Sequence, residues 1–73
     1  MPEEYGLPEN QKPDAPIIGG DGNVFGVMGT ASKALKRAGY RDAAGEMQTR
    51  VMASGSYDEA LQIILHYVNP TTA

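Results

Sequence analysis

The sequence predicts an all-α fold: a compact bundle of three short helices with an extended Pro- and Glu-rich N-terminal arm, assembled into an oligomer. Apolar residues recur at helical spacing in three successive stretches, and glycines or an Asn-Pro pair end each stretch. The chain has only 73 residues and no cysteine. A domain of this size buries a thin core, so self-association is expected to stabilise it and we predict a homo-oligomer.

Residues 1–16 are predicted to form an extended or disordered arm. Four of the five prolines and four carboxylates stand there, beside a single lysine. Proline lacks a backbone donor and biases the preceding residue towards extended geometry, so neither a helix nor a central strand fits. Tyr5 and Leu7 are the arm's only sizeable side chains for contacting a ligand or a neighbouring subunit.

The first helix is expected after a glycine-rich turn. Ile17 and Ile18, ahead of that turn, fit either a short strand or an apolar plug. Asn23 is a good N-cap, because its side-chain oxygen can accept from a free first-turn amide. Gly26 and Gly29 each cost about 1 kcal/mol relative to alanine inside a helix, so the backbone of a neighbouring helix or of a second subunit is expected to approach them closely. Gly39 should end the helix in a left-handed conformation. The apolar stripe consists of Val24, Val27, Met28, Ala31, Leu35 and Ala38.

The second helix is predicted from about Asp42 to Ser54, and Gly55 ends it. Its apolar face consists of Tyr40, Ala44, Met47 and Val51.

The third helix begins with a capping box. The Ser56 hydroxyl is expected to accept from the Glu59 amide, and the Glu59 carboxylate from the Ser56 amide. Asn69-Pro70 ends the helix, so the helical domain spans residues 17–69 and residues 70–73 form a tail. The side chains predicted to point inward are Tyr57, Ala60, Leu61, Ile64, Leu65 and Val68.

The distribution of charge is the main functional observation. The net charge is −3, yet residues 24–41 sum to +4. Lys33, Arg37 and Arg41 recur every fourth residue, and no acid stands one turn away to neutralise the row. Cations near a helix C-terminus are also favoured by the helix dipole, so a solvated face is the ordinary reading. The functional reading is a phosphate site, with Tyr40 stacking on a base. The predicted ligand-binding residues are Lys33, Lys36, Arg37, Tyr40, Arg41 and Arg50.

No catalytic signature accompanies these residues, so a non-enzyme is expected. Without cysteine and with a single histidine, His66, the chain offers no evident metal site, and no cofactor is predicted. Residues 17–73 are neutral overall, which argues against a nucleic-acid polymer as ligand. No apolar run approaches the roughly 20 residues that cross a bilayer, and no signal peptide is visible. We therefore expect a cytoplasmic protein without a membrane partner.

Two strings of the sequence, DGNVFGVMGTASKALKRAG and EMQTRVMASGSYDEAL, resemble small proteins of phages and mobile elements. Among named groups, the chain most resembles the phage anti-CBASS sponge proteins over residues 17–69. That resemblance implies a small, oligomeric, non-enzymatic protein that sequesters a cyclic nucleotide signal of antiphage defence. It carries over no site residue.

Three functions stay open at this point. The first is sequestration of a cyclic oligonucleotide at an oligomer interface, where a two-fold ligand suits a symmetric assembly. The second is a protein-binding inhibitor or adaptor, of phage or mobile-element origin, that acts on an acidic host partner. The third is a small helix-turn-helix DNA-binding regulator. For that role the third helix is poorly equipped, because it contains no Lys or Arg.

Overall fold

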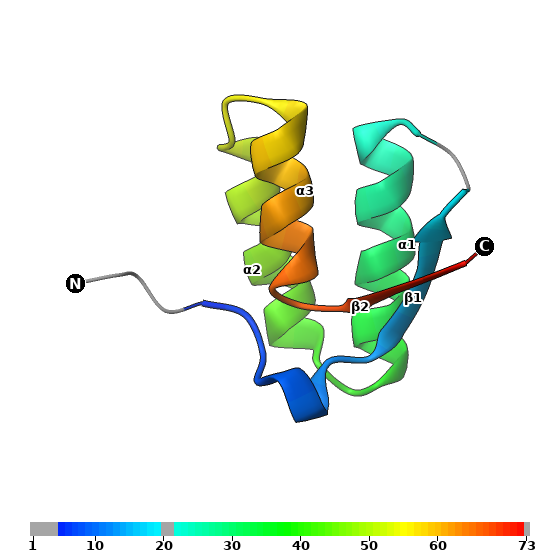
Figure 1. Cartoon of the computed structure of the whole chain (residues 1–73). Helices are drawn as coiled ribbons and strands as arrows, with labels where there is room; N and C mark the ends of the chain where they lie inside the picture. The colour runs from blue at the N-terminus through cyan, green and yellow to red at the C-terminus, as the bar shows by residue number, and fades with distance from the viewer. Residues whose placement is uncertain (1–4, 20–21, 73) are drawn as a thin grey trace.

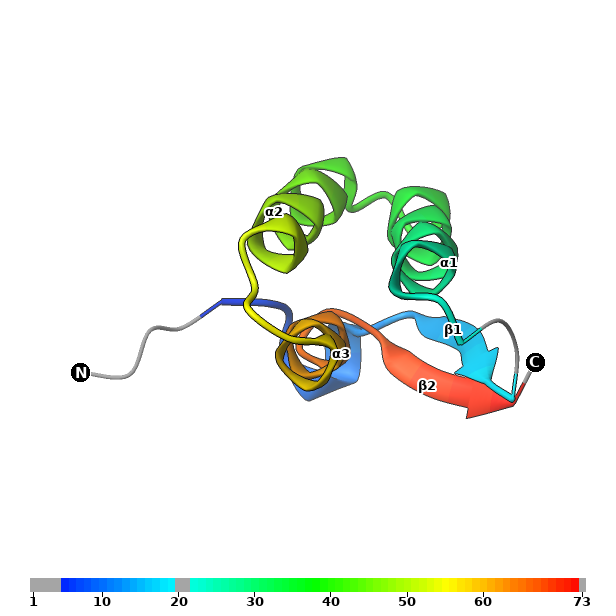
Figure 2. The ribbon, with the colours of Figure 1, turned by 90° about the horizontal axis from the view of Figure 1, so that it is seen from above.

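The computed structural model describes residues 5–19 and 22–72. The three helices pack against one another, and α2 contacts both α1 and α3 (Figures 1 and 2). Strand β1 lies along α1. The elements are a 3₁₀ turn η1 (Glu9–Gln11), β1 (Asp14–Ile18), α1 (Val24–Arg37), α2 (Arg41–Met52), α3 (Tyr57–Leu65) and β2 (Asn69–Thr72).

The all-α prediction is wrong, because β1 and β2 form a parallel two-stranded sheet. Asp14 lies opposite Asn69, and Pro16 lies opposite Thr71. The Asn69 amide donates to the Pro13 carbonyl at 2.9 Å. Of the two alternatives for Ile17 and Ile18, a short strand or an apolar plug, the strand is confirmed. The strand is longer than expected, because it begins at Asp14 within the proline-rich segment. Strand β2 occupies the segment that was expected to be a tail.

Proline does not prevent this pairing, because a two-stranded sheet contains only edge strands. The inward amide of β2 belongs to Asn69, and successive residues of a strand point their amides to opposite sides. Pro70, which has no amide hydrogen, therefore falls on the outer edge of β2, where no donor is needed. A proline on an outer edge also discourages the addition of a further strand.

Three predicted end signals of the helices are found, one of them with a changed donor, whereas the predicted end of the third helix at Asn69-Pro70 is wrong, because α3 already ends at Leu65. Asn23 Oδ1 accepts from a first-turn amide of α1 at 2.8 Å, and Gly39 adopts a φ of +92°. At the start of α3, Ser56 Oγ accepts from the Glu59 amide at 3.2 Å. The Glu59 carboxylate accepts from the Gly55 amide at 2.8 Å, one residue before the predicted donor.

The core lies between the three helices and beneath β1. One buried polar group, the Ser32 hydroxyl of α1, is satisfied by an amide hydrogen from Gln48 of α2 at 2.7 Å. The close backbone approach expected at Gly29 is not found among the described residues, because a Cβ built there meets none of their atoms within 4 Å. The buried apolar residues are Ala15, Val27, Ala31, Leu35, Ala44, Met47, Val51, Ala60, Ile63, Ile64, Tyr67 and Val68.

The buried side of α3 and of the segment that follows it is predicted only in part: Ala60, Ile64 and Val68 are buried as expected. Ile63 and Tyr67 are buried, although neither was assigned to the inner face. Tyr57 and Leu65, which were assigned to it, are 44% and 36% exposed. Because α3 carries apolar residues around most of its circumference, burying one side leaves an apolar stripe on the other. That stripe becomes one wall of a groove.

The segment before β1 is fastened to the C-terminal end of α3. The Leu7 amide donates to the His66 carbonyl at 2.9 Å. The Lys12 ammonium donates to the Leu65 carbonyl at 2.9 Å, and the Asn69 side-chain amide donates to the Lys12 carbonyl at 3.2 Å. A lysine at this position satisfies a carbonyl that the end of the helix leaves without an intrahelical donor.

Candidate binding surfaces

Three of the predicted site residues share the outer face of α1. Lys33, Lys36 and Arg37 are all exposed, and their spacing of three and four residues places them on one side of the helix. Burial of Ala31 and Leu35 turns the opposite side of α1 towards the core.

Arg41 joins these residues because the chain reverses tightly after α1. The Gly39 amide donates to the Lys36 carbonyl at 3.1 Å, and the Tyr40 amide donates to the Leu35 carbonyl at 2.8 Å. Arg41 is then the first residue of α2, so it lies at the same end of the molecule as the last turn of α1. We call the set Lys33, Lys36, Arg37 and Arg41 the cationic corner.

The cationic corner has no neutralising partner among the described residues: none of its four side chains makes a hydrogen bond or an ion pair there. The other two cations of the chain are both engaged. Lys12 lies 3.4 Å from a Glu9 carboxylate oxygen and also binds a backbone carbonyl. Arg50 lies 3.7 Å from a Glu46 carboxylate oxygen. The cations that have no partner among the described residues are therefore concentrated on one surface of an acidic protein.

The N-terminus of α2 adds to this surface. Helices α1 and α3 each begin with a side-chain cap, whereas Tyr40, the N-cap of α2, supplies none. Amides of a first helical turn lack intrahelical acceptors and carry a partial positive charge. Asp42 in the first turn of α2 offsets part of that charge. The Tyr40 ring is half-buried against the core, so only part of it is free to stack on a ligand.

Arg50 does not belong to the cationic corner. It stands in the last turn of α2, nine residues after Arg41, which corresponds to about 13 Å along the helix axis. Its guanidinium lies 4.3 Å from the centroid of the Tyr5 ring. Together with its contact to Glu46, this stacking connects α2 to the N-terminal arm.

An aromatic cluster surrounds that contact. The Tyr5 ring centroid lies 4.6 Å from that of His66 and 6.2 Å from that of Tyr67. The Tyr67 hydroxyl donates to a Glu46 carboxylate oxygen at 2.5 Å. Burial of the hydroxyl raises the pKa of Tyr67, and the hydrogen bond to Glu46 and its charge raise that pKa further. The cluster links the arm, α2 and the segment after α3, so its role is structural.

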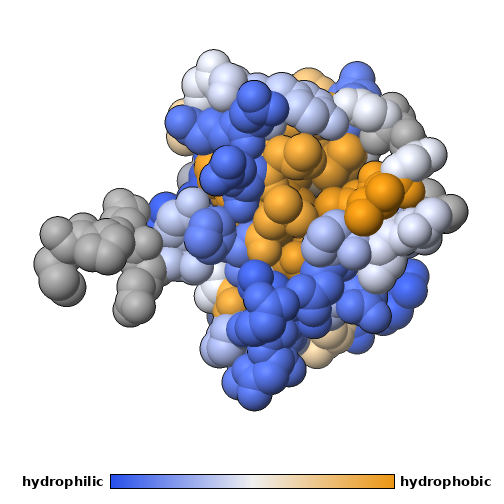
Figure 3. Space-filling model, in the orientation of Figure 1, coloured by the Kyte–Doolittle hydropathy of each residue, from blue (hydrophilic) through white to orange (hydrophobic). Residues whose placement is uncertain are grey.

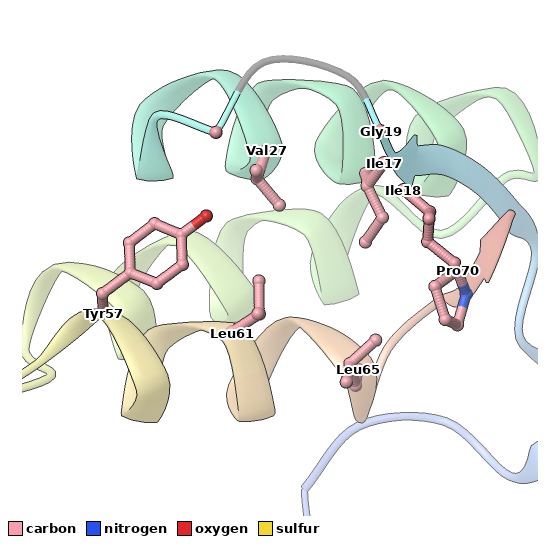
Figure 4. Close-up of a pocket in the computed structure, with 9 residues that line it drawn as sticks. Ile17, Ile18, Gly19, Val27, Tyr57, Leu61, Leu65 and Pro70 are labelled. Atoms are coloured by element: carbon pink, nitrogen blue, oxygen red, sulfur yellow. The ribbon is translucent and has the colours of Figure 1, made fainter. Parts of the chain in front are cut away.

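A groove between α1 and α3 is the feature that the sequence analysis missed. It encloses about 430 Å³. Figure 3 shows its apolar floor in the centre of the view, and Figure 4 shows α3 side chains facing those of α1 and β1 across it. The signal was present in the sequence, because α3 carries more apolar residues than one buried face needs. The apolar walls consist of Ile17, Ile18, Val27, Tyr57, Leu61 and Leu65.

A second hollow of about 320 Å³ adjoins the groove, and Tyr57 lines both. Two large apolar residues that line it, Phe25 and Met52, are 60% and 64% exposed. We call the surface formed by the two hollows the apolar face. No residue of the cationic corner lines either hollow, so the two surfaces are separate.

The described residues contain no cluster of three His, Asp or Glu side chains suited to a metal ion. Within that same part of the chain, every helix is too short or too polar to cross a membrane. Comparison with protein-family models, curated proteins and solved structures found no match to the chain. The resemblance to anti-CBASS sponge proteins therefore stays a prediction.

Proposed function

We propose that the protein is a non-enzymatic binding module that meets an acidic partner protein through the cationic corner. One observation carries the proposal: Lys33, Lys36, Arg37 and Arg41 are gathered at one end of the molecule without carboxylate partners among the described residues. Complementary charge steers association and selects among partners, even where each exposed contact adds little affinity.

The shape of the corner favours a macromolecule over a small ligand. Small-molecule sites are concave and enclose most of the ligand. Lys33, Lys36 and Arg37 project from the outer side of α1, and the two hollows of the apolar face lie elsewhere. A protein surface can contact such an exposed helix face along its whole length.

A cyclic oligonucleotide is a second candidate ligand, and the uncapped N-terminus of α2 favours it. Free first-turn amides bind phosphate, and a neighbouring arginine can hold the same group through two parallel hydrogen bonds. Arg41 and the partly exposed Tyr40 stand at that helix start. A DNA-binding role gains no such support, because Asp58 and Glu59 occupy the first turn of α3 and the helix has no cation.

Binding to a labelled polyglutamate peptide, measured by fluorescence anisotropy, tests the first proposal. The double variant K33Q/R37Q should weaken binding about tenfold or more, since two charge-assisted contacts of about 1 kcal/mol or more each are lost. The control Q11E/Q62E changes the net charge by the same amount on exposed residues outside the corner. It should bind as the wild type does. Equal weakening by both variants would mean that only total charge matters.

Thermal denaturation with a panel of cyclic di- and trinucleotides tests the second candidate. A ligand at 100 times its dissociation constant stabilises a protein by about 2.7 kcal/mol. Stabilisation that is lost in R41Q would support the cyclic oligonucleotide. A panel without any stabilising member would reject it and leave the acidic partner to be judged by the peptide titration.

A further inference from the structure

The exposed apolar side chains of the described residues gather on one face. The five large ones are Ile18, Phe25, Met52, Tyr57 and Leu65, and each borders the groove or the adjoining hollow. Exposed apolar residues that stand singly need no explanation, whereas a contiguous apolar surface marks an interaction site.

The apolar face suits an apolar partner. Among the described residues that line the two hollows, none carries a charge. A second copy of this acidic chain would therefore meet no like charge from these lining residues. These described lining residues would also bring no unpaired charge into the interface, where burying one is costly.

The layout of the face is self-complementary. Tyr57 lies between the groove and the adjoining hollow. On one side of it is the larger depression, with Leu61 and Leu65, and on the other side Phe25 and Met52 project into solvent. Rotation by 180° about an axis near Tyr57 exchanges these two sides, so it brings the projecting side chains of one copy over the groove of the other.

The number of residues that line the face approaches the number that a dimer interface uses. Nine described residues line each hollow and one is shared, so seventeen residues form it before any rim is added. A stable interface uses roughly 20–30 residues and about 800 Å² from each partner. That area is about a sixth of the 4720 Å² surface of the chain.

We propose that the apolar face is the interface of a two-fold homodimer, in which Phe25 of each copy inserts into the α1–α3 groove of the other. The thin core of a 73-residue chain gains the additional burial that small domains need. The dimer leaves the cationic corners free, so this inference stands independently of the proposed acidic partner.

Sedimentation equilibrium of the full chain, from micromolar to millimolar concentration, tests the proposal. The wild type should approach twice the 7.8 kDa mass of one chain. Phe25→Glu should raise the dissociation constant about thirtyfold or more, the effect of losing a central aromatic anchor. Ala38→Glu adds the same charge to an exposed position at the other end of α1 and should dimerise as the wild type does. A wild type that stays monomeric throughout would overturn the proposal.

Disulfide cross-linking tests where the two-fold axis of the dimer lies. This test does not require the Phe25→Glu variant to fold. The chain has no cysteine, so Tyr57→Cys introduces a single thiol near the proposed axis. It should form a disulfide-linked dimer on mild oxidation, because the paired backbones would approach within disulfide range. Ala38→Cys should not. Equal cross-linking of the two variants, or none at position 57, would contradict this geometry.

Discussion

At the scale of single residues, contacts distant in sequence decide what each cation does. Arg37 and Arg50 look equivalent in the sequence, since each is a cation near the end of a helix. Tyr5 and Glu46 engage Arg50, whereas Arg37 meets no described partner. The glutamate stands four residues before Arg50 and was visible in the sequence. Tyr5 is 45 positions away in the sequence, so no local sequence pattern indicates its contact with Arg50.

This difference predicts unequal effects of two identical substitutions. Arg37→Gln should leave the free energy of unfolding within about 0.5 kcal/mol of the wild type, as exposed helix substitutions do. Arg50→Gln should lower it by about 1 kcal/mol, because a cation–π contact and an ion pair are lost. Urea denaturation of both variants measures the difference. Equal destabilisation would mean that Arg37 has a structural role.

Tyr67 should make the fold sensitive to alkaline pH. Burial and Glu46 raise the pKa of Tyr67 in the folded protein, whereas in the unfolded chain the hydroxyl titrates near its usual value of about 10. The stabilisation is therefore complete below pH 10 and is lost as the pH rises above it. The free energy of unfolding should fall by up to about 1.4 kcal/mol per pH unit.

Tyr67→Phe removes the titrating group and provides the comparison. Below pH 10 the variant should be less stable than the wild type, because it loses the hydrogen bond to Glu46. Its free energy of unfolding should then fall less steeply than that of the wild type above pH 10, in urea titrations at matched pH values. If the free energy of unfolding falls with pH equally in both proteins, groups other than Tyr67 cause the loss of stability at alkaline pH.

At the scale of secondary-structure elements, local chemistry predicted the helices well. Caps at Asn23 and Ser56 and the left-handed Gly39 are determined by a few neighbouring residues, and all three are found. The strands were not predicted in full. A strand of four residues with a proline shows no alternating pattern, and Asp14 and Asn69 are separated by 55 positions.

The groove was missed for a related reason. Apolar spacing showed that α3 has a buried face, but Tyr57, Leu61 and Leu65 fit a helical stripe as well as Ala60 and Ile64 do. Only the positions of α1 and β1 decide which stripe is buried. Likewise, the sequence grouped Arg50 with the cationic corner because it could not show how far along α2 the site extends.

The N-terminal arm is an element whose attachment depends on one glycine. Gly6 adopts a φ of +93°, and a Cβ at this position would collide with the His66 carbonyl, which accepts the Leu7 amide. Gly6→Ala should therefore detach the arm and lower the free energy of unfolding by about 2 kcal/mol. Loss of hydrogen-exchange protection at the Leu7 amide would report the detachment directly.

Gly45→Ala is the matched control for that prediction. Gly45 lies inside α2, and a Cβ there meets nothing within 4 Å. The substitution should raise the free energy of unfolding by about 1 kcal/mol, because alanine is the better helix former. Similar destabilisation by both substitutions would contradict the assigned role of Gly6.

At the scale of the whole molecule, a small fold carries two surfaces of different chemistry. The apolar face comprises the groove between α1 and α3 and the adjoining hollow. The cationic corner lies where α1 is connected to α2, and Figure 1 shows the course of the chain there. Neither surface shares a residue with the other. A protein arranged in this way can associate with itself through one surface and present a charged site on each copy through the other.

Such an arrangement predicts avidity. A homodimer with two free cationic corners should bind a bivalent acidic surface more tightly than a monomer does, because the second contact is intramolecular. Phe25→Glu should lose that gain on an immobilised acidic surface while its affinity for a single polyglutamate peptide stays unchanged. Surface plasmon resonance and anisotropy separate the two effects. Loss of affinity for the single peptide would place Phe25 in the binding site itself.

The central claim is that the position of the four cations of the cationic corner, rather than total charge, creates the binding site. The most direct test compares the dissociation constants of K33Q/R37Q and Q11E/Q62E for the polyglutamate peptide, since the two variants have the same net charge. We predict that the first binds about tenfold or more weakly than the second. Equal dissociation constants for the two variants would contradict the claim.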